Sequence, residues 1–171
     1  MFIKTLIIAF IPTGIAFLAG ALLPIQVSGN AAVGKALGHP LWGALVSLMV
    51  SMLVLAPLLW VIKVPSPRLA VALAGPWWLW IGGIVGAIYV LSATALTPVL
   101  GAASFIVLVV AGQTIAAIAV DHWGLMGLAP RPVTLARLAG GMLIVVGVVL
   151  VQYTGRSGSE GNTMVSTDSR R

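Results

Sequence analysis

Side chains able to perform acid-base, nucleophilic or metal chemistry are few in this chain. Its 171 residues include three acidic residues, two histidines and no cysteine. Outside the polar C-terminal stretch, this inventory reduces to His39, Asp121 and His122. These three residues lack metal-ligand spacing, and the sequence contains no nucleophile elbow, phosphate loop or HExxH motif. We therefore expect a protein that is not an enzyme and that uses no metal or cofactor.

Polar side chains interrupt a long apolar run in the stretch "LPIQVSGNAAVGK". Gln26 and Asn30 are four positions apart and would share one face of a helix, while Pro24 lacks a backbone N–H and can kink it. One interpretation is a substrate or gating surface. The other is that the first span ends near Val27, so that the polar groups face interfacial water.

Gln113 lies about midway along another apolar run, with apolar residues on both sides. An unpaired amide inside lipid is costly, so this side chain should face the interior of a helix bundle. It would either touch a substrate or form a hydrogen bond to a neighbouring helix, with Thr114 assisting.

Asp121 and His122 close that same apolar run. A carboxylate at a helix C-terminus opposes the helix dipole, so Asp121 should have a basic partner. Arg131 and Arg137, beyond the following turn, are two candidates, and Lys35 of an inverted second copy is a third. The alternative is a solvated pair at the membrane interface.

The elements that carry these residues follow from composition. Hydrophobic residues make up 60% of the chain and charged residues 7%, against roughly 25% charged residues in soluble domains. Crossing the membrane takes about 20 apolar residues in a helix. We therefore predict an all-α polytopic membrane protein with five transmembrane helices, approximately Ile3–Val27 with continuation toward Ala32, Trp42–Ile62, Trp77–Leu96, Gly101–Val120 and Thr134–Tyr153.

The loops between these spans are too short to hold a soluble domain, and Thr134 is placed to cap the fifth helix. After Tyr153 the composition changes to "TGRSGSEGNTMVSTDSRR". We predict a transmembrane domain over residues 1–153 and a disordered polar tail over residues 154–171. The formal charge of +6 is scattered between apolar runs, which argues against a nucleic-acid partner.

Basic residues also bear on orientation, because cytoplasmic loops carry an excess of lysine and arginine. With five spans, five basic residues fall on the side of the N-terminus and four on the other, two of which lie at the far end of the tail. This bias favours a cytoplasmic N-terminus. With an odd number of spans, a second copy fused head to tail would also insert upside down, which is how transporters with inverted repeats are built.

Three sequence blocks resemble a known family. The patterns "PxQxxxNxxxGK", "GGxxGxxYV" and "GQxxxxxxxDHxG" occur in this order between Leu6 and Val151. In this combination the chain resembles the YdcZ-type short bacterial inner-membrane proteins of the drug/metabolite transporter superfamily. The motif positions in this chain are Pro24, Gln26, Asn30, Gly34, Lys35, Gly82, Gly83, Gly86, Tyr89, Gln113, Asp121, His122 and Gly124.

The resemblance implies half of a ten-helix transporter in the inner membrane, with two copies exporting a small metabolite or drug. We expect a homodimer, parallel or antiparallel, that works by alternating access along a pathway lined by Gln26, Asn30, Tyr89 and Gln113. The alternative is a non-transporting membrane subunit that packs against a partner protein. We expect helix packing, rather than chemistry, at Gly82, Gly86 and Gly112.

Ion coupling is where the chain departs from a related group. The small multidrug resistance proteins resemble this architecture but place a glutamate within the first span for proton exchange, and this chain has no acid there. Asp121 is the sole acid in the predicted helical region. Proton coupling through Asp121, with His122 and Lys35 nearby in an inverted pair, is therefore a hypothesis.

Overall fold

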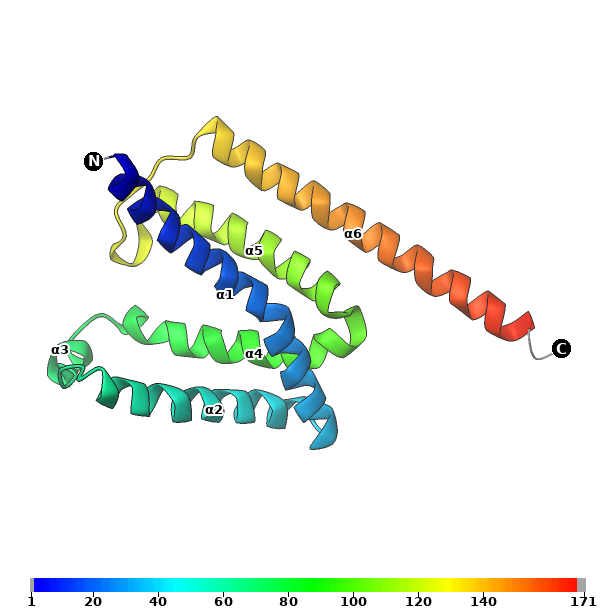
Figure 1. Cartoon of the computed structure of the whole chain (residues 1–171), viewed down its shortest axis with the longest axis horizontal. Helices are drawn as coiled ribbons and strands as arrows, with labels where there is room; N and C mark the ends of the chain where they lie inside the picture. Colours follow the sequence, from blue (N-terminus) through cyan, green and yellow to red (C-terminus); the bar gives the residue numbers. More distant parts are fainter. Residues whose placement is uncertain (1, 169–171) are drawn as a thin grey trace. The chain divides into compact units, whose positions relative to one another are not determined.

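Five long helices dominate the chain (Figure 1). The computed structural model describes the backbone of residues 2–168 and the side chains of residues 10–153. Over this backbone the predicted all-α class is confirmed, and no strand occurs between residues 2 and 168. The elements are α1 (Phe2–Ala36), α2 (Pro40–Val61), α3 (Leu69–Leu73), η1 (Trp77–Trp80), α4 (Ile81–Leu100), α5 (Ala102–Trp123), η2 (Leu125–Gly127) and α6 (Leu135–Asp168).

Five segments of the described chain are long and apolar enough to cross a membrane, which confirms the predicted number of spans. They are Phe10–Ala36, Pro40–Val61, Trp77–Leu100, Ala102–Trp123 and Leu135–Tyr153. The helical backbone of α6 continues past Tyr153 to Asp168. The disordered tail over residues 154–171 stays a prediction.

The largest difference from the sequence-based boundaries is at the end of α1. This helix does not end near Val27 but continues to Ala36, so the interpretation of a span that frays into water is wrong on this point. The physical reason is packing: Val27, Ala31 and Gly34 recur at helical spacing and are buried. Contacts with other helices therefore extend α1 through its polar residues.

The helix ends have identifiable local causes. Gly38 adopts a left-handed backbone with φ of 85°, which ends α1 at low steric cost, and Pro40 then occupies the first turn of α2. The Nδ1 atom of His39 caps α2 by accepting a hydrogen bond from the Leu41 N–H at 3.2 Å. The predicted cap of α6 is also confirmed, because Thr134 Oγ1 accepts the Arg137 N–H at 3.3 Å.

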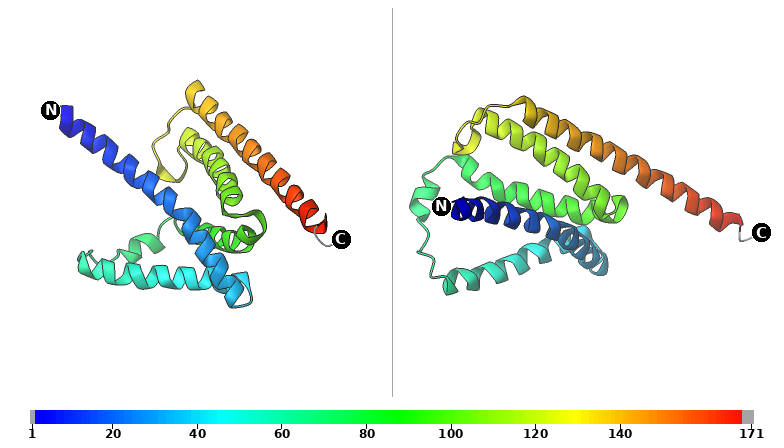
Figure 2. Two further views of the ribbon diagram at one scale, coloured as in Figure 1. Left: turned by 45° about the vertical axis from the view of Figure 1, so that its right-hand side comes forward. Right: turned by 45° about the horizontal axis from the view of Figure 1, so that its top comes forward.

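By its internal contacts the chain divides into two compact units. The first contains α1, α2 and nearly all of α4, and the second contains η1, nearly all of α5, η2 and α6. In the first unit, the C-terminal end of α1 lies beside the N-terminal end of α2, as the views in Figures 1 and 2 agree. The core of this unit lies near that end and includes Val27, Ala31, Ala44, Val90 and Ala93.

Candidate functional site

Three helices of the first unit meet at Gly34, Gly43 and Thr94. A Cβ atom built on Gly43 of α2 would lie 2.8 Å from the Gly34 nitrogen and 2.8 Å from Thr94 Cγ2, and it would also press on the Asn30 carbonyl oxygen. A Cβ on Gly34 of α1 would lie 3.0 Å from Thr94 Cγ2. The two glycines therefore allow a close approach of α1, α2 and α4, in the way that small residues do between membrane helices.

The face of α4 that enters this junction is small and contains two threonines. Thr94 is 1% exposed, and its Oγ1 donates a hydrogen bond to the Val90 carbonyl oxygen at 2.8 Å. Thr97, one turn later, is also buried. Because Pro98 has no N–H, the Thr94 carbonyl lacks its usual donor four residues further along the helix. The Thr94 carbonyl oxygen is therefore left without its usual helical hydrogen bond, beside the junction.

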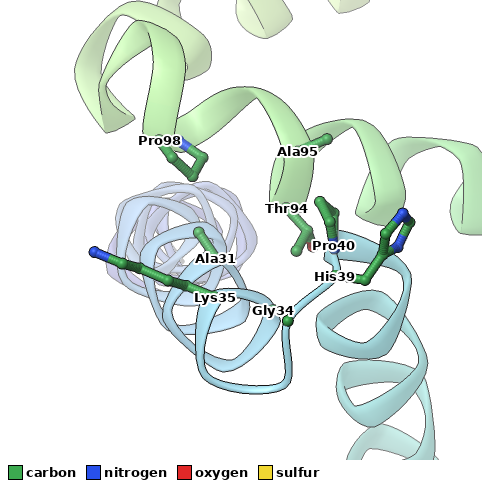
Figure 3. Close-up of a pocket in the computed structure, with 9 residues that line it drawn as sticks. Ala31, Gly34, Lys35, His39, Pro40, Thr94, Ala95 and Pro98 are labelled. Carbon is green, nitrogen blue, oxygen red and sulfur yellow. The ribbon is translucent and has the colours of Figure 1, made fainter.

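A hollow of about 350 Å³ adjoins the junction (Figure 3). Figure 3 shows Ala31 and Pro98 on one side of it, and Thr94 and Pro40 on the other. The Lys35 side chain extends away from Thr94, so its ammonium group is not directed at the threonine. The hollow is lined by Ala31, Gly34, Lys35, Gly38, His39, Pro40, Thr94, Ala95 and Pro98.

The predicted polar pair lies close to this junction. Asn30 is half-buried, and its backbone carbonyl oxygen faces Gly43. Gln26 lies one turn earlier on α1 and is exposed. Tyr89 is half-buried on α4, in the same unit. The structure thus places three of the four predicted pathway residues in one unit, with Asn30 at the three-helix contact.

Gln113 belongs to the second unit, on α5, and its side chain is exposed. The expectation that it faces a bundle interior is not met within that unit. Residues are rotated by about 100° from one position to the next in a helix. The face of α5 toward α6 begins one position later, with Thr114, and continues through Ala117 and Ile118, so Gln113 lies to the side of it.

Asp121 has the basic partner expected from its position. Arg137 Nη1 lies 3.4 Å from Asp121 Oδ2, and the two side chains are 38% and 36% exposed, respectively. Arg131, the other candidate in the same chain, contributes its backbone N–H, which donates to the Asp121 carbonyl oxygen at 2.7 Å. His122 is exposed and stacks edge-on against Trp123, with ring centroids 5.6 Å apart. Contact of Asp121 with Lys35 of a second copy stays a prediction.

Gly124 of the third motif has a clear structural role. Its φ is 60°, and a Cβ atom there would lie 2.7 Å from Pro130 Cγ and 2.9 Å from the Leu128 carbonyl oxygen. Its N–H donates to the Asp121 carbonyl oxygen at 3.4 Å. Glycine is therefore required to end α5 and to fold the following loop back against Asp121.

The glycines expected to pack helices are not the ones in close contact. Around Gly82, Gly86 and Gly112, a Cβ atom would meet nothing within 4 Å in the described chain. Close approach occurs instead at Gly34, already a motif residue, and at Gly43, which sequence reasoning missed. A signal was present, because both glycines flank the short turn that brings the two helix ends together. Packing by the other three glycines stays a prediction.

A comparison with known protein families identifies the family of this chain. Residues 11–150 match the family described as "Putative inner membrane exporter, YdcZ". The chain belongs to this YdcZ family. No curated protein and no solved structure matches it. Family membership and five membrane-capable helices together identify a multi-pass inner-membrane protein of a transporter family, and an exporter is not an enzyme class.

Proposed function

We propose that this chain is one half of an inner-membrane exporter, in which two copies form a homodimer that moves a small metabolite or drug by alternating access. Family membership supports the export function. The odd number of spans supports pairing of two units, because a head-to-tail fusion of two such units would give the inverted repeats from which many transporters are built.

The main support for this proposal is the position of Gln26 and Asn30 within α1. Both lie inside α1 rather than in a frayed end, and the backbone of Asn30 contacts Gly43. Polar side chains inside a membrane helix need a partner or water, so they mark helix contacts or a cavity. We assign Gln26 to the substrate pathway because its polar side chain is exposed within a membrane-capable helix, where an amide left in lipid would be costly.

The junction can serve as a pivot for the movement of α1. Gly34, Gly43 and Thr94 hold its C-terminal end in close contact, whereas the side chains of residues 10–22 are exposed. In the proposed cycle, the N-terminal part of α1 rocks about this contact. The pathway lined by Gln26, Asn30, Tyr89 and Gln113 then opens first to one side of the membrane and afterwards to the other.

A reconstituted system tests the proposal. The purified wild-type chain is placed alone in liposomes, and counterflow is measured with a panel of labelled metabolites and cationic drugs. We expect flux for at least one compound. Gln26→Leu and Gln113→Leu should lower that flux at least tenfold while leaving insertion and dimerisation unchanged.

Ser28→Leu is the matched control for Gln26→Leu. Ser28 is exposed on α1 two positions after Gln26, and a rotation of about 200° places it on another face. Its substitution should leave flux within about twofold of wild type, which corresponds to less than about 0.5 kcal/mol. Absence of flux for the whole panel with correctly folded protein would favour the non-transporting subunit instead. Loss of dimerisation in Gln113→Leu would assign that amide to assembly.

A further inference from the structure

A second hollow lies within the second unit, between α5 and α6. It has a volume of about 350 Å³. Its apolar part is lined by Ala117, Ile118, Gly140 and Gly141, and the Asp121–Arg137 ion pair closes one end. Its lining residues include none of the proposed pathway residues.

The glycines on α6 explain why the hollow exists. A Cβ atom on Gly141 would lie 3.4 Å from Ile118 Cδ1, so the two helices are in ordinary contact there. A Cβ on Gly140 would meet nothing within 4 Å. Because no side chain fills the space beside Gly140, the hollow forms an apolar channel, open along its outer side, next to the contact of α5 with α6.

The charged end of the channel has unused hydrogen-bonding capacity. Arg137 and Asp121 are joined by one contact of 3.4 Å, and each side chain is more than one-third exposed. A guanidinium group has five N–H donors, and a carboxylate has two acceptor oxygens. Most of these donors and acceptors are therefore available to a ligand that carries both an anionic and a cationic group.

The location of the ion pair points to a lipid. Asp121 lies in the last turn of α5, and the neighbouring Trp123 is 67% exposed, as expected for an aromatic residue at the headgroup level. From Asp121 the channel runs along α5 toward Thr114, which is about 10 Å at the helical rise. This arrangement offers polar groups at the membrane edge and an apolar channel toward the membrane centre.

We propose that this hollow binds a phospholipid whose headgroup carries a primary ammonium next to the phosphate, as phosphatidylethanolamine does. The phosphate lies against Arg137, the ammonium donates to Asp121, and part of an acyl chain occupies the channel beside Gly140. Arginine is suited to phosphate because its planar fork matches two oxygens. Asp121 disfavours a purely anionic headgroup, and a quaternary ammonium has no N–H to donate to it.

The test uses native mass spectrometry of the purified, delipidated full-length chain. Dioleoyl lipids with ethanolamine, glycerol or choline headgroups are added at equal concentration, and the bound fraction is measured. We expect the ethanolamine lipid to bind about tenfold more tightly than the other two, the scale of one charge-assisted hydrogen bond. Asp121→Asn should remove this preference, and Arg137→Gln should weaken binding of all three lipids.

Filling the channel provides a test that leaves both charges in place. Gly140→Leu should fold, because nothing lies within 4 Å of the added Cβ, and it should lower binding of the ethanolamine lipid about tenfold. Gly112→Leu is the matched control: it is the same substitution with similar free space, on the face of α5 turned about 180° from Asp121 and outside the hollow. Its binding should equal that of wild type.

Two results would overturn this assignment. One is equal binding of the three lipids to the wild-type chain, which would mean that the ion pair does not recognise the headgroup. The other is wild-type lipid binding by a folded Gly140→Leu chain, which would mean that the channel is not occupied. Neither result depends on transport, so the proposed export function is tested separately.

Discussion

At the scale of single residues, the close contacts of Gly43 predict that a substitution there lowers stability. In Gly43→Ala the new methyl group would lie 2.8 Å from a backbone nitrogen of α1, and backbone atoms of a packed helix cannot move aside cheaply. We expect a loss of about 1–3 kcal/mol in the free energy of unfolding, the usual cost of overpacking. Reversible unfolding in mixed detergent micelles, followed by circular dichroism, measures it.

Gly29→Ala is the control for this substitution. Gly29 lies within α1, and a Cβ there would meet nothing within 4 Å. Alanine has a higher helix propensity than glycine by about 1 kcal/mol, so this variant should be as stable as wild type or more so. Equal stability of the Gly43→Ala and Gly29→Ala chains would show that α1 and α2 are not in close contact in the membrane.

At the scale of elements, the start of α2 depends on an imidazole cap. His39→Ala removes the Nδ1 acceptor of the Leu41 N–H, and we expect it to lower the free energy of unfolding by about 1 kcal/mol. Asparagine is a good N-cap residue, so His39→Asn should retain most of the stability. The same detergent unfolding measurement applies. A His39→Asn chain as unstable as His39→Ala would show that the imidazole acts through the adjoining hollow instead.

The elements also show how far the sequence alone could lead. Apolar runs and turn residues predict five spans, and the Thr134 cap and the Asp121 partner follow from local chemistry. The end of α1 could not be placed in this way, because polar residues there favour water unless tertiary contacts hold them in a helix. The turn that Gly34 and Gly43 flank indicates a contact between α1 and α2, but the additional contact with Thr94 of α4 depends on the three-dimensional packing.

At the scale of the whole molecule, the five spans make the orientation of two copies testable. If successive spans cross the membrane in alternate directions, Lys35 at the end of α1 and Asp121 at the end of α5 belong to opposite membrane edges. The hydrocarbon core that separates these edges is about 30 Å thick. Lys63, which follows α2, lies at the same edge as Asp121. In an inverted pair, Lys35 of one copy reaches the edge that holds Asp121 of the other.

Cross-linking separates the two arrangements, because the wild-type chain has no cysteine. Lys35→Cys and Asp121→Cys chains with different tags are produced together and treated in membranes with a bismaleimide much shorter than the membrane thickness. If the two copies are inverted, these two chains should give a heterodimeric product. The matched pair of Lys63→Cys with Asp121→Cys should give little product. The reverse pattern would establish a parallel dimer, in which the modest bias of basic residues toward the N-terminal side would orient every copy in the same direction.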